Sequence, residues 1–215
     1  MNEELRRIDV ETVHEPLPER TDHDPTVVGV LLAAGGSSRF GERNKLLAEI
    51  DGKPLVRRAA RTLLDSRVSR VVAVLGHQSS AVQEVLADFD VAFVANDAYE
   101  HGLSTSVERG ARAAADGDAD AAIFLPGDMP FVESATVDLL VDCFAGGVAD
   151  AAAAAYEGQR GNPVLFGADH FDALCAVDGD VGGKDVLLDD GVLLDTDDAG
   201  VVMDIDTQDD LERVR

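Results

Sequence analysis

The feature that most limits the fold of this chain is a series of short apolar runs, each with the length of a β-strand. The first run, VVGVLLA at Val27–Ala33, is apolar throughout, which is typical of a strand buried on both faces of a parallel sheet. Three similar runs follow, at Val71–Leu75, Val91–Val94 and Ala121–Leu125. Stretches with helical periodicity separate the runs, at Pro54–Asp65, Ser80–Asp88 and Ser104–Ala115. This alternation predicts a three-layer α/β/α fold with a mostly parallel, Rossmann-like sheet.

The chain on either side of this region is less regular. Residues 1–26 carry eight acidic residues, three arginines and three prolines without a sustained apolar period, so we expect a mobile acidic tail. Residues 27–215 are expected to form one domain with two halves, at 27–130 and 131–215. The elements expected in the second half are helices at Ser134–Phe144, Asp169–Leu174, Lys184–Leu188 and Thr207–Val214, and strands at Ala151–Tyr156, Pro163–Phe166 and Val201–Met203.

Charge narrows the classes of partner. The chain has 42 acidic and 18 basic residues and a net charge of −24, so it should repel nucleic acid and anionic membranes. Only three of the basic residues are lysines, which is typical of a halophilic protein in a high-salt cytosol, although an ordinary acidic protein is the alternative. No apolar run is long enough to span a bilayer and no signal segment is visible, so we expect a cytoplasmic protein. The two cysteines show no metal-binding or disulfide pattern and are expected to be buried, reduced thiols.

The first apolar run leads directly into a glycine-rich loop, Leu32 to Leu46, with the sequence LAAGGSSRFGERNKL. Glycines at the carboxyl end of a parallel strand allow backbone N–H groups to approach phosphate oxygens. Arg39, Arg43 and Lys45, set against Glu42, give the loop a local charge of +2 within a strongly acidic chain. The loop has neither the GxxxxGK[ST] pattern of a P-loop nor the GxGxxG pattern of a dinucleotide-binding fold. It therefore indicates a phosphate-binding site of another type.

Two aspartates are candidates for a metal site. Asp128 comes directly after the run AAIFL, so its carboxylate should lie at the same edge of the sheet as the glycine loop. Asp206 lies in the segment DIDTQDDL near the C-terminus. Magnesium needs only a few carboxylates together with water and substrate phosphate oxygens. Both aspartates have a purely structural alternative, because Asp128 could cap the next helix and Thr207 with Asp210 forms a variant of the helix capping box.

The loop LAAGGSSRFG, followed by Asn44–Lys45 and by GKPLV at Gly52–Val56, resembles the molybdenum-cofactor nucleotidyltransferases, or MobA-like NTP transferases, of the nucleotide-diphospho-sugar transferase superfamily. The resemblance implies that Arg39 and Lys45 contact the triphosphate and that Asp128 and Asp206 hold Mg²⁺. It also implies catalytic roles for Arg39, Lys45 and Asp128. The other residues that it assigns to the nucleotide are Leu32, Ala33, Ala34, Gly35, Gly36, Ser37, Asn96 and Ser104, with Ser104 alternatively a helix N-cap.

Two segments of the second half resemble the acceptor side of the cytidylyltransferase branch of this family. GQRGNPVLF, from Gly158 to Phe166, resembles its RGHPVLF segment, and GDVGGK, from Gly179 to Lys184, resembles its GDxGAR segment. The acceptor-binding residues implied are Arg160, Gly161, Asn162, Pro163, Gly182, Gly183 and Lys184. Asn162 replaces the usual histidine, and this departure leaves the identity of the acceptor in question.

The function that these features predict is Mg²⁺-dependent transfer of a nucleoside monophosphate from an NTP to a phosphorylated acceptor, with release of pyrophosphate. CTP is the favoured donor and molybdopterin the favoured acceptor, with a molybdoenzyme or its chaperone as a further partner. GTP as the donor, or a sugar phosphate or another phosphorylated acceptor, are the enzymatic alternatives. A nucleotide-binding chaperone without turnover is a further alternative, but intact Lys45, Asp128 and Asp206 argue against it. No serine or histidine has a pattern that favours covalent catalysis or metal binding.

Overall fold

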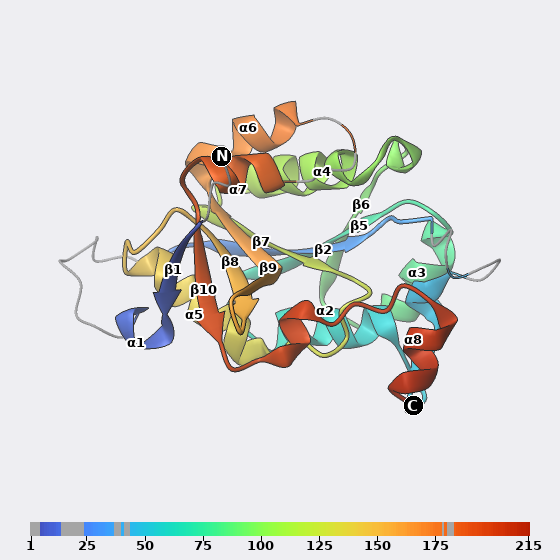
Figure 1. Ribbon diagram of the computed structural model, residues 1–215. Coiled ribbons are helices and arrows are strands. Elements are labelled where there is room, and N and C mark those ends of the chain that lie inside the picture. Colours follow the sequence, from blue (N-terminus) through green and yellow to red (C-terminus); the bar gives the residue numbers. More distant parts are fainter. Residues whose placement is uncertain (1–4, 14–23, 37–39, 41–43, 178, 180–182) are drawn as a thin grey trace.

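A single large sheet forms the centre of the molecule (Figure 1). The computed structural model describes residues 5–13, 24–36, 40, 44–177, 179 and 183–215. The eight strands of the large sheet have the order β1-β10-β8-β9-β7-β2-β5-β6. Within this sheet, β9 is the strand that runs antiparallel to both of its neighbours. The strands are β1 (Arg6–Asp9), β2 (Val27–Ala33), β5 (Arg70–Leu75), β6 (Val91–Ala95), β7 (Ala121–Pro126), β8 (Ala151–Tyr156), β9 (Gln159–Gly167) and β10 (Val192–Thr196). The expected mostly parallel sheet is confirmed.

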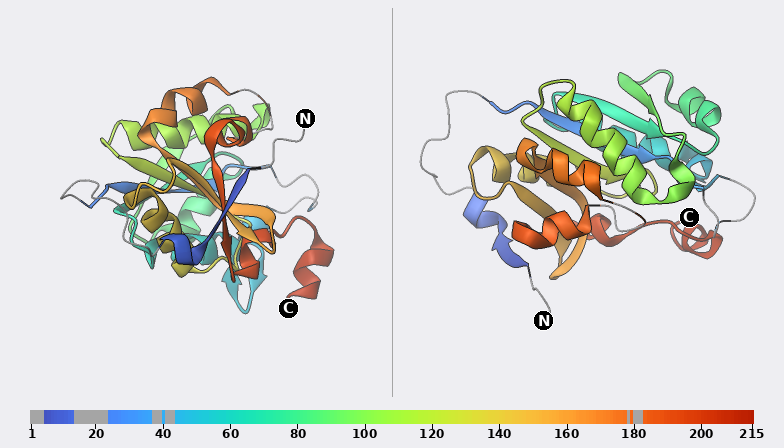
Figure 2. Two further views of the ribbon diagram at one scale, coloured as in Figure 1. Left: turned by 60° about the vertical axis from the view of Figure 1, so that its left-hand side comes forward. Right: turned by 90° about the horizontal axis from the view of Figure 1, so that it is seen from above.

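Helices cover both faces of this sheet and complete the three layers. One face carries α4, α6 and α7, and the opposite face carries α2, α3 and α5 (Figures 1 and 2). The α-helices are α1 (Val10–Val13), α2 (Leu55–Leu64), α3 (Ser79–Leu86), α4 (Leu103–Ala115), α5 (Ser134–Ala145), α6 (Phe171–Ala176), α7 (Lys184–Asp190) and α8 (Gln208–Arg213). Short 3-10 helices are η1 (Lys45–Leu47), η2 (Tyr99–His101), η3 (Ala168–His170) and η5 (Ala199–Val202), and β3 (Glu49–Ile50) and β4 (Lys53–Pro54) form a small hairpin.

The central strands supply both hydrophobic cores by alternation of their side chains. Along β2, Val28 and Val30 face the apolar cluster that packs under α4, whereas Val27, Leu31 and Ala33 face the cluster under α2. All five side chains are fully buried. A strand that is buried on both faces has no position for a polar residue, which explains why the run VVGVLLA is apolar throughout.

The N-terminal region differs from the expected mobile tail. Residues 6–9 form β1, which pairs in parallel with β10, and Val10–Val13 form the short helix α1. Ile8 and Val13 are buried, and Arg7 forms an ion pair with Asp195 of the neighbouring strand. The expectation failed here because the strand is held mainly by backbone pairing and by one buried side chain, neither of which produces an apolar period in the sequence. Residues 14–23 of the expected tail lie outside the described residues.

The C-terminal region contains a second difference. Val201–Met203 does not form the expected strand, because residues 199–202 form η5, whose N-cap Asp198 accepts a hydrogen bond from the backbone N–H of Gly200. The strand in this region is instead β10, which sequence patterns did not indicate. The expected helices and the other expected strands are present, with β9 starting four residues earlier than Pro163 and including a cis Asn162–Pro163 peptide bond.

Parallel strand order places several loops at one edge of the sheet. The carboxyl ends of β2, β5 and β7 are neighbours, because β2 pairs with β5 on one side and with β7 on the other. The glycine-rich loop, His77 and Asp128 follow these three strands and therefore meet at this edge. In the described parts of the chain, no helix has the length and apolar character needed to cross a membrane.

Candidate active site

A cleft of about 740 Å³ opens at this edge of the sheet. One wall is formed by the start of the glycine-rich loop, with Leu32, Ala34, Gly35 and Gly36 lining it. The opposite wall comes from η2 and the first turn of α4, and includes Tyr99, Leu103 and Ser106. The side chain of Ala33 is fully buried and points into the core, so it does not line the cleft. Ser37 and Arg39 lie outside the described residues.

The floor of the cleft holds Lys45, Asp128 and Asp206, which are far apart in the sequence. Lys45 Nζ lies 2.5 Å from Asp128 Oδ2 and 2.5 Å from Asp206 Oδ1. The three side chains are 14%, 16% and 32% exposed, respectively, so the ammonium group is largely shielded from solvent between two carboxylates. The structure thus brings together three residues that sequence analysis had assigned to one site.

Local structure fixes each member of this cluster. Lys45 is the first residue of η1, where the Asn44 side chain accepts a hydrogen bond from the backbone N–H of Leu46, and Leu46 is buried. Asp128 follows β7, and its backbone carbonyl accepts a hydrogen bond from the N–H of Ile205. That backbone contact holds the Asp206 segment against the end of β7.

A role in helix capping was the structural alternative for Asp128 and for the segment of Asp206, and the structure gives a different answer for each. Thr207 and Asp210 form a reciprocal capping box at the start of α8, as their spacing predicts. Asp206 precedes this box, so the same segment both starts a helix and presents a carboxylate to the cleft. Asp128 does not cap a helix, because the next helix, α5, begins after the N-cap residue Glu133.

Electrostatics hold Lys45 in its charged form. Burial acts to lower the pKa of Lys45, but the charges of Asp128 and Asp206 and their hydrogen bonds outweigh it, so the pKa lies above its ordinary value. A third carboxylate, Asp204, lies near this pair. Burial raises the pKa of Asp204, and the negative charges of Asp206 and Asp128 raise it further. Among the residues that the structure describes, these three carboxylates outnumber the one ammonium group that contacts two of them.

One atom of this cluster fits a metal ion in particular. Asp128 Oδ1 is buried and has no hydrogen-bond partner among the residues that the structure describes, so its lone pairs are available to a ligand in the cleft. Carboxylate oxygens are the ligands that Mg²⁺ and Mn²⁺ prefer. The described residues contain no group of three or more His, Cys, Asp or Glu side chains arranged around a common metal position. A metal ion here would therefore need substrate oxygens to complete its coordination.

Asn96 supports the wall of the cleft from behind, and Ser104 is buried in the first turn of α4. Asn96 is 1% exposed, and its amide donates hydrogen bonds of 3.0 Å to both Thr105 Oγ1 and Ser106 Oγ. Ser106, which lines the cleft, is thus oriented by Asn96. Ser104 is buried and is not the N-cap of α4, because Gly102 occupies that position. Neither Asn96 nor Ser104 lines the cleft itself.

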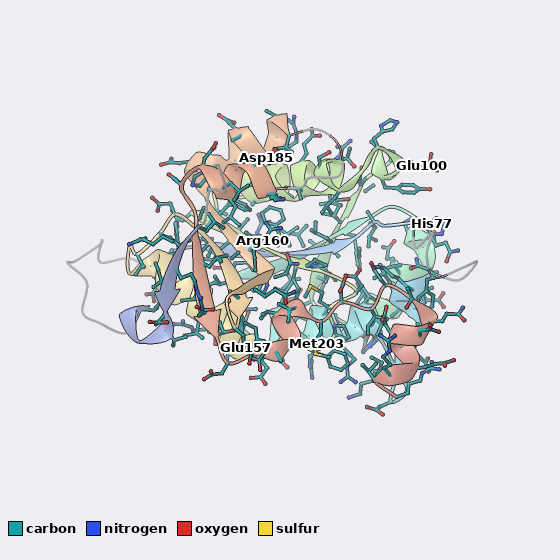
Figure 3. The ribbon with its side chains drawn as sticks, in the orientation of Figure 1. His77, Glu100, Glu157, Arg160, Asp185 and Met203 are labelled. Carbon is teal, nitrogen blue, oxygen red and sulfur yellow. The ribbon has the colours of Figure 1, made fainter. Side chains whose placement is uncertain are left out.

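The residues expected to bind the acceptor lie on β9 and at the start of α7, and they do not line this cleft. Arg160 and Lys184 are exposed, and Figure 3 shows Arg160 on the β9 side of the molecule, away from His77 and Glu100 at the cleft. Gly161 packs against the backbone of η5, where an added Cβ would lie 2.0 Å from the Val201 carbonyl oxygen. Asn162 and Pro163 follow in the same strand, Gly183 precedes α7, and Gly182 lies outside the described residues. The acceptor assignment stays a prediction.

Sequence analysis missed several residues that line the cleft. His77 follows β5, and Tyr99 and Glu100 belong to the segment between β6 and α4. The signal that would have found His77 is its position, because it follows a buried parallel strand next to the strand that carries the glycine loop. Asp204 does not line the cleft but lies near Asp206, and its signal is the DxD spacing of these two residues.

Comparison with known protein families agrees with this geometry. The family of the MobA-like NTP transferase domain matches residues 29–193, which is most of the chain. The chain therefore belongs to this family of nucleotidyltransferases. Among solved structures, a nucleotidyl transferase from Methanothermobacter thermautotrophicus is 27% identical, with a TM-score of 0.72 over 88% of this chain and 96% of that chain. Rv0371C from Mycobacterium tuberculosis H37Rv, in complex with manganese, has the same fold, with 23% identity and a TM-score of 0.71 over 88% of this chain and 97% of that chain.

Relatives with similar sequences carry diverse names. The purine catabolism protein PucB of Bacillus subtilis is 30% identical over 89% of this chain and 97% of its own length. The nicotine blue oxidoreductase of Paenarthrobacter nicotinovorans is 31% identical over 88% of this chain and 97% of its own length. The "Probable molybdenum cofactor guanylyltransferase" of Haloferax mediterranei is 31% identical over 55% of each chain. The family is thus defined, whereas its members are named for different pathways.

Proposed function

We propose that the protein transfers a nucleoside monophosphate from an NTP to a phosphorylated acceptor, with molybdopterin as the favoured acceptor and pyrophosphate as the second product. The observation that carries this proposal is the position of Lys45 between Asp128 and Asp206 at the floor of a cleft lined by the glycine loop. Cationic and anionic groups meet there, at a loop whose local charge is +2 in a strongly acidic chain. Such a site suits a triphosphate bound with a divalent cation.

The chain's own residues would position and stabilise the reacting groups. The backbone of Ala34, Gly35 and Gly36 would face the nucleotide, and Lys45 with Arg39 would share the negative charge that develops on the α-phosphate and the pyrophosphate. An acceptor phosphate oxygen would attack the α-phosphorus in line, while the bond from the α-phosphorus to the bridging oxygen of the pyrophosphate breaks. No enzyme-bound intermediate is needed.

Asp128 and Asp206 are the residues that would hold Mg²⁺. The available lone pairs of Asp128 Oδ1 support this assignment, and Asp206 lies on the other side of Lys45 Nζ. When bound, the ion would supply positive charge to the phosphate oxygens. Manganese is present in the solved structure of the mycobacterial protein with the same fold, so Mn²⁺ is a suitable probe for this site.

The base of the donor nucleotide and the identity of the acceptor are inferred from fewer residues than the reaction itself. The motif LAAG and the segments GQRGNPVLF and GDVGGK favour CTP, because they resemble the cytidylyltransferase branch. The Haloferax relative, named as a guanylyltransferase, favours GTP as the second candidate. The names of PucB and the nicotine blue oxidoreductase carry no common substrate that would distinguish these two donors.

The test is a measurement of pyrophosphate release with CTP, GTP, UTP and ATP, each with and without molybdopterin, in Mg²⁺ and high salt. Release that needs molybdopterin and one preferred NTP would support the proposal and would identify the base. Nucleotide binding without pyrophosphate release would favour a non-catalytic chaperone. Release with a sugar phosphate but not with molybdopterin would reject the proposed acceptor while retaining the reaction.

A further inference from the structure

We infer that Gln208 is a positioning residue for the nucleotide loop. Its side chain donates a hydrogen bond from Nε2 to the backbone carbonyl of Phe40, at a distance of 3.1 Å. Phe40 lies within the glycine-rich loop, between Gly36 and Lys45. Gln208 therefore binds the main chain of the loop that the proposed function assigns to the triphosphate, and the inference rests on that function.

The side chain of Phe40 attaches the loop to the same part of the molecule. Phe40 is 4% exposed and belongs to a small apolar cluster with Ile50, Leu55, Ile205 and Leu211. Two members of the cluster, Ile205 and Leu211, flank Gln208 in the sequence. Phe40 thus contacts the segment 205–211 through its side chain and through its carbonyl group.

The segment 205–211 also places the proposed metal ligands. It contains Asp206, and the N–H of Ile205 donates a hydrogen bond of 3.0 Å to the carbonyl of Asp128. A single short segment therefore contacts the phosphate loop, carries Asp206 and is hydrogen-bonded to the main chain of Asp128. In the described part of the loop, the polar contact from this segment is the hydrogen bond of Gln208 to Phe40, so Gln208 should set the distance between the bound triphosphate and the carboxylates.

The role of Gln208 can be separated from the formation of α8. Gln208 is the first residue of the helix, and the capping box of Thr207 and Asp210 starts the helix without the Gln208 side chain. Proline is well tolerated at this first position, and Thr207 has φ −127° and ψ 165°, an extended conformation of the kind that a residue before proline adopts. Gln208→Pro should therefore remove the amide group while keeping the helix.

The experiment compares Gln208→Pro and Gln208→Leu with the wild type and with Asp209→Asn, a substitution at the exposed neighbouring position. Calorimetric titration would measure the binding of CTP and GTP in Mg²⁺ without acceptor, and a separate titration would measure Mn²⁺ without nucleotide. Loss of one hydrogen bond to the loop should weaken binding of the preferred nucleotide by about two- to tenfold. The affinity for Mn²⁺ alone should stay within twofold of the wild type, and Asp209→Asn should bind both ligands like the wild type.

The outcomes separate this inference from the proposed function. Nucleotide affinity within twofold of the wild type in both Gln208 variants would overturn the inference while leaving the proposed function in place. Equal weakening of nucleotide and Mn²⁺ binding would also overturn it, because that result indicates general damage to the site. Failure of the wild type to bind any NTP would instead overturn the proposed function. Thermal unfolding of each variant would verify that the titrations are made on folded protein.

Discussion

At the scale of single residues, Lys45 is the side chain with the most unusual surroundings. Its ammonium group is shared between two carboxylates, and the pKa shift described above shows that these neighbours hold it in the charged form. A group in this position has two possible effects on ligands: it attracts the phosphates of a nucleotide and it competes with a metal ion for the carboxylates. Substitution of Lys45 can distinguish these effects, because removal of the charge should weaken nucleotide binding and strengthen metal binding.

Lys45→Met should therefore change two affinities in opposite directions. Methionine keeps the length of the side chain but removes the charge, so pyrophosphate release should fall by about 100-fold or more. The affinity for Mn²⁺ without nucleotide should rise, because the carboxylates lose a competing cation. Electron paramagnetic resonance of free Mn²⁺ would measure the second effect, with the exposed Lys53→Met as the control. Weaker Mn²⁺ binding in Lys45→Met would contradict this account of the cluster.

Asp128→Asn tests the metal assignment directly. The amide has the shape of the carboxylate but lacks its charge, so metal binding and turnover should be lost while the fold is retained. Mn²⁺ titration and pyrophosphate release would measure the first two effects, and circular dichroism with thermal unfolding would verify the third. An active Asp128→Asn variant would show that this residue is not a metal ligand.

Cys143 gives a prediction for the dependence of stability on pH. Burial raises the pKa of this thiol to about 11, whereas an unfolded cysteine has a pKa of about 8.5. Below about pH 8.5 both states hold the proton, so the stabilising contribution is fully present. As the pH rises from about 8.5 to 11, the unfolded state loses its proton first and the contribution falls by about 3 kcal/mol.

Urea unfolding of the wild type and of Cys143→Ala at pH 7.5 and pH 10.5 would check this sign. At pH 7.5, the difference in the free energy of unfolding between the wild type and Cys143→Ala measures the effect of the smaller side chain and of any cavity that it leaves. The wild type should then lose more stability than Cys143→Ala between the two pH values. Parallel loss in both proteins would mean that Cys143 does not contribute to the pH dependence.

At the scale of elements, the sequence predicted the strands that consist of a continuous run of apolar residues. The strands β2, β5, β6 and β7 were found because each is a continuous apolar run in the sequence. β1 was missed because it has one buried residue and charged neighbours, and η5 was mistaken for a strand because Val201 and Val202 are apolar. Short elements whose geometry depends on a cap or on a neighbouring strand leave no period in the sequence.

The candidate site likewise contains residues that could be predicted from the sequence and contacts that could not. Asp128 and the glycine loop could be predicted because both follow buried parallel strands, and Asp206 because its segment resembles a known motif. The contacts of Asn96 and Gln208 could not be predicted, since each depends on the approach of segments that are distant in the sequence or on the exact turn of a short helix. Tertiary packing, rather than local pattern, determines these positions.

Substitution of two glycines by alanine should have opposite effects on stability and on nucleotide binding, because the two positions have different surroundings. Gly161 in β9 faces the backbone of η5, and a Cβ there would lie 2.0 Å from the Val201 carbonyl oxygen, whereas a Cβ at Gly35 would meet no atom of the described residues within 4 Å. Gly161→Ala should therefore lower the free energy of unfolding by about 2 kcal/mol or more. Gly35→Ala should leave stability within about 0.5 kcal/mol and should weaken nucleotide binding, because its backbone lines the cleft.

Urea denaturation and nucleotide titration of both variants would measure these effects. If Gly161→Ala were as stable as the wild type but failed to use the acceptor, the glycine would act in binding instead of packing. If Gly35→Ala lost stability without losing nucleotide affinity, the glycine loop would have a structural role at that position.

At the scale of the whole molecule, the net charge of −24 should control stability through salt. Repulsion among surface carboxylates is screened over about 10 Å at 0.1 M salt and over about 3 Å at 1 M. The free energy of unfolding should therefore rise by about 2 kcal/mol or more between 0.1 M and 2 M KCl, despite weakening of surface ion pairs such as Arg57–Asp88. Urea unfolding at the two salt concentrations would measure the change, and stability that falls with KCl would contradict the prediction of a halophilic protein.

The pairing of β1 with β10 has a consequence for how the molecule remains separate from its copies. Without β1, the sheet would end at β10, whose buried Val192, Leu193 and Leu194 would then belong to an open edge with free backbone N–H and C=O groups. Such an edge is a template for joining strands of another molecule. The outermost strand is instead RRID, in which three of four residues are charged. The N-terminal segment thus covers this edge with a charged strand, at the side of the sheet farthest from the nucleotide cleft in strand order.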